Sequence, residues 1–78
     1  QNYSWWDDLN DARRTVIISQ VFNMGLSRFR GFKKQIKALE RKDFTRASEE
    51  MRSSRWYNQN TSRVESLAVW MDSGIIPE

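Results

Sequence analysis

The stretch DARRTVIISQVFNMG, residues 11–25, decides the fold class of this 78-residue chain. Its apolar residues cover more than one face of a helix: Val16, Ile17, Ile18, Val21, Phe22 and Met24. A helix that is apolar nearly all round is usually packed on several sides. Asp11 is positioned to cap this helix, and Gly25 to end it as a C′ glycine. We therefore predict a buried central helix at residues 12–24.

Apolar residues recur at helical spacing in three segments downstream of this helix. The first segment covers residues 32–42, and Asp43 is positioned to cap the second. The last helix begins at Asn60 or Thr61 and is closed by Gly74. Each segment has one apolar face, so each is expected to pack that face against its neighbours.

Short turns are predicted between these helices. Residues 27–31 are too few for a stable helix, and Trp56 and Tyr57 lie in a second short turn. Three glycines and one proline are few for a β-rich or loop-rich chain. A chain of 78 residues is long enough for one small domain. The predicted fold is therefore all-α, a single helical domain over residues 1–78 around the central helix.

The composition excludes several kinds of chemistry. Because the chain has no cysteine and no histidine, it has no disulfide, no thiolate or imidazole metal site and no histidine base. We expect no metal and no cofactor. The net charge of +3 fits an acidic polymer as partner, whether nucleic acid, an anionic membrane surface or a cell-wall glycan. No apolar run approaches the length needed to span a membrane, so we expect no stable membrane insertion.

Near the N-terminus, rings and acids gather as they do in some sugar-binding subsites: Trp5, Trp6, Asp7, Asp8 and Asp11. Aspartates ahead of a helix also have a simpler explanation, since the helix dipole favours negative charge at that end. We favour this second interpretation, and assign none of these carboxylates a catalytic role.

A basic stretch interleaved with phenylalanines follows the central helix: Arg28, Phe29, Arg30, Phe32, Lys33, Lys34 and Lys37. Interleaved cations and rings are typical of surfaces that bind acidic polymers, including nucleic acids. The alternative is that the rings belong to the core and the cations form a solvated face. Since no nucleic-acid fold signature accompanies the stretch, we favour the alternative and expect no nucleic-acid partner.

The stretch SRWYNQNTSR, residues 54–63, places rings, amides and guanidinium groups side by side. Such a segment could stack a sugar on an aromatic face and bind its hydroxyl or N-acetyl groups by hydrogen bonds. The same residues could equally supply core packing and helix caps. Composition alone leaves the two interpretations open.

This stretch resembles the S-R-W-x-x-Q-x-x-x-R signature of phage-type lysozymes, the relatives of the T-even phage lysozyme in glycoside hydrolase family 24. The segments DARR (11–14), VFNMG (21–25) and SRFRGF (27–32) are similar to further motifs of that family, in the same order. The resemblance runs from about Trp6 to Gly74. It implies the helical C-terminal lobe of a two-lobed enzyme, with Trp56 packed into the core of that lobe.

The resemblance also implies what this chain lacks. The family's general-acid Glu, its Asp and its active-site Thr lie in an N-terminal region that has no counterpart here. We therefore assign no catalytic residue and expect the isolated chain to hydrolyse nothing. The first residue is Gln1 rather than an initiator Met, so we interpret the chain as a piece of a longer protein.

The residues that the resemblance assigns to substrate binding are Phe22, Asn23, Phe32, Arg55 and Gln59. It implies that peptidoglycan is the partner, together with the missing N-terminal lobe, and that the chain is a monomer. Glu50 stands where an acid would repel an acidic substrate. The parent enzyme would stay in the host cytoplasm until it is released to the cell wall or periplasm during lysis.

Two other functions fit the same lobe. It could be a non-catalytic module that binds peptidoglycan, or a purely structural unit. Binding to insoluble peptidoglycan that depends on Arg55 and Asn23 would distinguish the first from the second.

Overall fold

Six α-helices and a 3-10 helix make up the computed structural model, which describes residues 4–77. The prediction of an all-α chain is confirmed, since no strand occurs within those residues. In chain order the elements are η1 (Ser4–Asp8), α1 (Asp11–Met24), α2 (Leu26–Arg30), α3 (Lys33–Glu40), α4 (Phe44–Arg52), α5 (Arg55–Gln59) and α6 (Thr61–Ser73).

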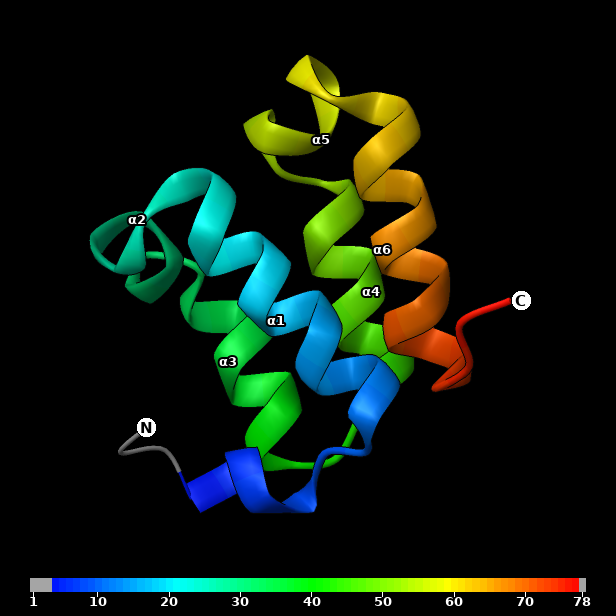
Figure 1. Cartoon of the computed structure of the whole chain (residues 1–78). Coiled ribbons are helices and arrows are strands. Elements are labelled where there is room, and N and C mark those ends of the chain that lie inside the picture. The colour runs from blue at the N-terminus through cyan, green and yellow to red at the C-terminus, as the bar shows by residue number, and fades with distance from the viewer. Residues whose placement is uncertain (1–3, 78) are drawn as a thin grey trace.

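The helices α4 and α6 form the most extensive contact in the molecule and lie side by side, with α3 against the other side of α4 (Figure 1). Met51 of α4 and Met71 of α6 are fully buried, as is Val64 near the start of α6. Leu39 brings α3 into the same core. In the sequence, only the short α5 separates α4 from α6, so this contact joins helices that are near neighbours along the chain.

The helix α1 runs across the middle of the molecule in Figure 1 and contacts mainly α2 and α6. Its central position agrees with the prediction, but the expected burial on all sides was wrong. Val16 and Ile17 are buried, whereas Ile18 is 56% exposed and Phe22 88% exposed. The reason is that α1 packs mainly on α6 and α2, which leaves one apolar face of the helix uncovered.

A pair of glutamines joins α1 to α3 inside the core. The Gln20 Nε2 donates to Gln35 Oε1, and the Gln35 Nε2 donates to Gln20 Oε1, each at 2.9 Å. Both side chains are almost completely buried. The two amides satisfy each other, so polar groups are tolerated at positions where helical patterning would place apolar ones.

The first helix is capped by Asn10, so the predicted cap at Asp11 was one residue late. The Asn10 Oδ1 accepts from the backbone N–H of Arg13 at 2.9 Å. Asn60 precedes α6, but its side chain makes no capping hydrogen bond to that helix. Three other predicted helix ends are confirmed: Asp43 Oδ1 accepts from the Arg46 N–H at 3.1 Å, and Gly25 and Gly74 have φ of +88° and +75°. Glycine reaches such positive φ values without steric cost.

Side chains at the start of α1 cap the C-terminal end of α6 by hydrogen bonds to its last carbonyls. The Arg13 Nε donates to the Met71 carbonyl at 2.7 Å, and its Nη2 donates to the Asp72 carbonyl at 2.8 Å. The Asn10 Nδ2 donates to the Gly74 carbonyl at 2.9 Å. Burial lowers the pKa of Arg13 from its ordinary value. A cation at a helix C-terminus is favourable because the last carbonyls carry partial negative charge.

The connections between helices differ from the predicted turns. The predicted turn at 27–31 is the helix α2, and Trp56 and Tyr57 belong to the helix α5. The segment predicted over 32–42 is helical only from Lys33 to Glu40. Helices of five residues form here because neighbouring elements hold them, which no local pattern reveals.

Trp5 belongs to the core and Trp6 packs against it, which argues against the interpretation of these rings as a sugar subsite. Trp5 is 2% exposed, and its ring centroid lies 6.3 Å from that of Phe29. Phe29 is itself 1% exposed, as the core interpretation of the basic stretch requires. The element η1 therefore covers the core where it contacts α3 and where its Trp5 ring meets Phe29 of α2.

Candidate substrate-binding surface

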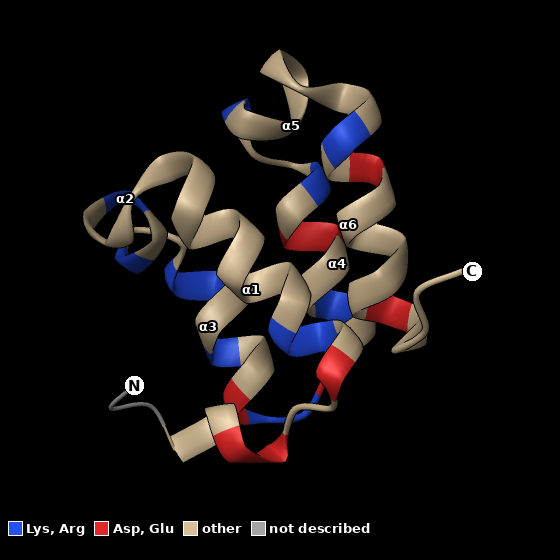
Figure 2. Ribbon diagram, in the orientation of Figure 1, with Lys and Arg blue, Asp and Glu red and all other residues tan. Residues whose placement is uncertain are grey.

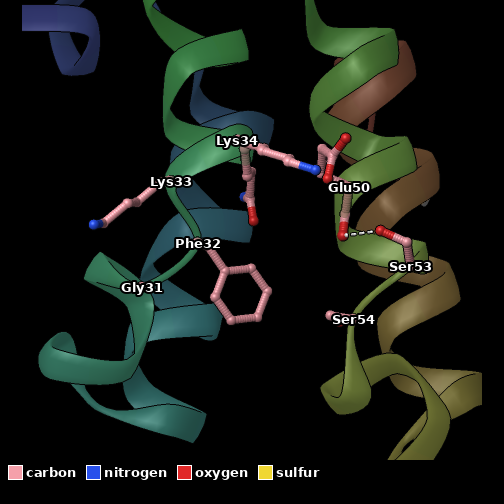
Figure 3. A pocket seen from close by; sticks show the side chains of 8 residues that line it. Gly31, Phe32, Lys33, Lys34, Glu50, Ser53 and Ser54 are labelled. Atoms are coloured by element: carbon pink, nitrogen blue, oxygen red, sulfur yellow. Dashed lines mark hydrogen bonds between the residues drawn. The ribbon is translucent and has the colours of Figure 1, made fainter.

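A hollow of about 370 Å³ lies where α2 meets α3 and α4 meets α5 (Figure 3). Residues 31–35 form one wall, and Glu50, Ser53 and Ser54 form the other. We call it the Phe32 hollow. The two walls come from segments about twenty residues apart in sequence, brought together because α3 packs along α4.

The aromatic wall of this hollow is Phe32, which caps α3 at its N-terminus. Its ring centroid lies 6.4 Å from that of Trp56, in an edge-to-face arrangement. Trp56 is only half-buried, so it packs against the core as expected but does not sit within it. Both rings are partly exposed, as stacking against an apolar ring face requires.

The rim of the Phe32 hollow carries charges of both signs. Lys33 points away from the other wall, whereas Lys34 extends across toward Glu50 (Figure 3). The Glu50 Oε2 lies 3.2 Å from the Arg46 Nε, one helical turn earlier in α4. Because Arg46 balances this carboxylate, Glu50 repels an anionic ligand less than the sequence suggests, and the lysines set the local potential.

Arg55 and Gln59 both lie on α5, one on each side of Trp56 in sequence, with exposed side chains that do not line the Phe32 hollow. The helix α5 is capped at its N-terminus by Ser54, whose Oγ accepts from the backbone N–H of Tyr57 at 3.1 Å. This cap fixes where α5 starts and thereby places Arg55 at its exposed first turn.

Asn23 lies at a second hollow of about 340 Å³, between the end of α1 and α6. The Arg63 Nη1 donates to Asn23 Oδ1 at 3.2 Å, and the Asn23 Nδ2 donates to the Ser19 carbonyl at 2.7 Å. Phe22, the neighbouring residue, lines a third hollow of about 230 Å³ on α1. The five residues assigned to the substrate are thus spread over the surface rather than gathered in one pocket.

A three-residue network that the sequence did not suggest holds α5 against α6. The Arg52 guanidinium donates to both oxygens of Glu65 at 2.9 Å, and the Tyr57 hydroxyl donates to Glu65 Oε1 at 3.1 Å. The hydrogen bonds from Arg52 lower the pKa of Glu65, while the hydrogen bond to Glu65 raises that of Tyr57. The thirteen-residue separation of Arg52 and Glu65 matches no helical spacing, so only the fold reveals the pair.

Other kinds of site are not evident in the described part of the chain. Within residues 4–77 no three acidic side chains come close enough together to hold a metal ion. No described helix combines the length and apolarity needed to cross a membrane. The lowered pKa of Glu65 is the opposite of what a general acid needs at neutral pH.

Known proteins similar in sequence to this chain include two from Dictyostelium discoideum. The chain is 30% identical over 71 residues to "Probable T4-type lysozyme 1" of Dictyostelium discoideum, a match that covers 91% of this chain and 42% of that protein. It is 29% identical over 73 residues to "Probable T4-type lysozyme 2" of the same organism, which covers 94% and 43%. The chain therefore spans less than half the length of these curated relatives. No protein-family model matches it.

Proposed function

We propose that this chain, a T4 lysozyme-like domain, is the C-terminal lobe of a phage-type lysozyme and forms the wall of its substrate cleft. The intact protein would hydrolyse the β-1,4 bond between N-acetylmuramic acid and N-acetylglucosamine in peptidoglycan. The observation that carries the proposal is similarity across nearly the whole chain to less than half of each relative. A helical fold with no strand in its described residues agrees with such a lobe.

The Phe32 hollow is the part of this lobe that we assign to the glycan. A sugar ring would stack on Phe32, which is supported from behind by Trp56. The ammonium groups of Lys33 and Lys34 would attract the carboxylates of the stem peptides. Arg55, on the adjacent α5, would extend this attraction beyond the rim of the hollow.

Hydrolysis requires groups that we expect in the other lobe. Glycosidases use two carboxyl groups on either side of the scissile bond, one of them with a raised pKa. Glu65 is engaged with Arg52 and has a lowered pKa, so it does not suit the role of the acid. We therefore propose that the 78-residue chain binds peptidoglycan but does not cleave it.

The uncovered face of α1 is the surface that we assign to the catalytic lobe. Ile18 and Phe22 are exposed there, next to a hollow that is lined wholly by apolar residues of the same helix. Contiguous exposed apolar side chains commonly mark surfaces that contact another protein or domain. The lobe would bury this face in the intact enzyme, and in this proposal Phe22 contacts that lobe rather than the substrate to which the family resemblance assigns it.

Binding can be tested by sedimenting the chain with insoluble peptidoglycan from which phosphate-containing polymers have been removed. We expect the chain to be retained, and Phe32→Ala and Arg55→Ala each to weaken retention several-fold. Arg41→Ala is the matched control, because Arg41 is an exposed arginine outside the Phe32 hollow. Equal retention of all four proteins would refute the assignment of this surface.

Catalysis is tested separately, by following the turbidity of a peptidoglycan suspension with the purified 78-residue chain. No clearing is expected. Turnover by material free of any longer protein would contradict the assignment of the catalytic groups to another lobe.

A further inference from the structure

A second basic surface lies on the far side of Lys34 from the Phe32 hollow. It surrounds a hollow of about 240 Å³ between α3 and the start of α4, which we call the Arg41 hollow. Four cationic side chains line it: Lys34, Lys37, Arg41 and Arg46. We propose that it binds a flexible phosphodiester polymer that carries no bases, such as a chain of alditol phosphates. This inference does not rest on the proposed lysozyme function.

The cations are arranged as a row. Lys34, Lys37 and Arg41 stand at i, i+3 and i+7, so they follow one face of α3 and the turn after it. The row covers about 10 Å of helix axis. Figure 2 shows the basic residues along α3 and in that turn. Because Lys34 lines both hollows, the basic row is continuous with the rim of the Phe32 hollow.

The row keeps its charge available for a ligand. Arg46 is balanced by Glu49 at 3.7 Å and Glu50 at 3.2 Å. Within residues 4–77, no carboxylate lies within 4.0 Å of the charged nitrogens of the three residues of the row, Lys34, Lys37 and Arg41. One acid, Asp43, lies on the rim of the hollow, and its Oδ1 is already engaged by the Arg46 N–H. Lys37 and Arg41 therefore share the hollow with one carboxylate, that of Asp43, whereas Lys34 also extends toward Glu50 on its other side (Figure 3).

The shape and composition of the Arg41 hollow favour a phosphodiester over other anionic partners. Arginine and lysine both bind phosphate well, arginine through paired hydrogen bonds. Sites for single-stranded nucleic acid add aromatic side chains on which bases stack, and no aromatic residue lines this hollow. Helices that bind membrane surfaces insert large apolar side chains, and the one apolar residue here is Ala38.

The inference can be tested by titrating the 78-residue chain with a fluorescent glycerol phosphate oligomer at 50 and 200 mM salt. Three phosphate contacts on a flexible polyanion predict that affinity falls roughly 20-fold between the two salt concentrations. The triple variant Lys34→Gln, Lys37→Gln, Arg41→Gln should bind at least tenfold more weakly at 50 mM salt and lose most of the salt dependence. The single variant Lys37→Gln should lose about a third of the slope of log affinity against log salt concentration, because it removes one of three phosphate contacts.

The matched control removes the same charge from exposed residues that do not line the Arg41 hollow, by Arg28→Gln, Arg30→Gln and Arg63→Gln. It should retain affinity within about twofold, and circular dichroism verifies that each variant is folded. Equal loss in both triple variants would overturn the proposal, because net charge alone would then explain binding. Tighter binding of an oligothymidylate of equal charge, or of phosphatidylglycerol vesicles, through the same three residues would overturn it in favour of that other partner.

Discussion

Gln20 and Gln35 determine how α1 meets α3. Each amide is buried and makes its hydrogen bonds to the other, at 2.9 Å. Removing one partner leaves a buried amide without its hydrogen bonds, whereas removing both leaves an apolar contact. The pair therefore favours one alignment of the two helices at little net cost in stability.

A double-mutant cycle tests this at the residue scale. Gln20→Met alone should lower the free energy of unfolding by about 1–3 kcal/mol, since it strands the amide of Gln35. The double variant with Gln35→Met should recover most of that loss. Urea denaturation at neutral pH measures all four proteins. Strictly additive effects would show that the two amides do not depend on each other.

At the scale of elements, α5 is held by side chains rather than by its own helical propensity. Five residues are too few for a stable helix in water. Glu65 of α6 accepts hydrogen bonds from Arg52 of α4 and Tyr57 of α5, so one carboxylate ties three helices together. Arg55 and Gln59 take their positions from this arrangement.

The network should make stability depend on pH. The pKa of Glu65 is lowered on folding, so the stability it contributes is present above the ordinary pKa of glutamate and lost as the pH falls through the lowered value. Glu65→Gln should therefore be less stable than the original chain at pH 7, and the difference should shrink toward acid pH. Urea denaturation at a series of pH values measures it.

Glu49→Gln provides the control for this prediction. Glu49 is exposed and lies 3.7 Å from Arg46, which also pairs with Glu50. Exposed pairs of this kind contribute at most about 1 kcal/mol. A Glu65→Gln difference that stayed constant from pH 7 to pH 3 would argue against the role given to Glu65.

At the scale of the whole molecule, the chain measures 31 × 29 × 20 Å, and its apolar residues are unevenly covered. Two phenylalanines illustrate the extremes, since Phe29 is 1% exposed and Phe22 is 88% exposed. The core is complete without Phe22, whose ring lies on the uncovered face of α1. This is the face that the proposed catalytic lobe would bury.

Matched substitutions of these two residues test the distinction. Phe22→Ala should change the free energy of unfolding by no more than about 0.5 kcal/mol, as is usual for surface changes. Phe29→Ala should lower it by about 3–5 kcal/mol, as for buried phenylalanines elsewhere. Thermal unfolding of the original chain and the two variants measures these changes in the free energy of unfolding. A large loss for Phe22→Ala would mean that the ring packs within the chain.

Local chemistry made much of the fold predictable. Helical apolar spacing predicted the main helices, and Gly25, Asp43 and Gly74 marked helix ends that the structure confirms. These signals act within a few residues, through backbone conformation and capping hydrogen bonds. The sequence did not distinguish between adjacent residues that could both cap a helix. Asn10 rather than Asp11 caps α1, because the Asn10 side chain accepts a hydrogen bond from the Arg13 N–H.

The candidate site was less predictable, because its parts come from distant segments. Phe32 was predicted from the sequence as a substrate-binding residue. The opposite wall of its hollow, at Glu50 and Ser53, was not predictable, because it depends on how α3 packs along α4. The assignments of Phe22, Asn23, Phe32, Arg55 and Gln59 to substrate contact came from family resemblance and stay predictions. The structure separates them, with Asn23 beside Arg63 of α6 and Phe32 beside Trp56 of α5.

The residues alone were thus enough to establish that the chain is helical, to place several helix ends, and to exclude histidine and cysteine chemistry. Which apolar residues form the core became clear from the packing of the helices. The stretch at residues 11–25 looks apolar on more than one face, yet Ile18 and Phe22 face outward. The physical reason is that periodicity specifies which side chains share a face of a helix, whereas burial depends on which other helices cover that face.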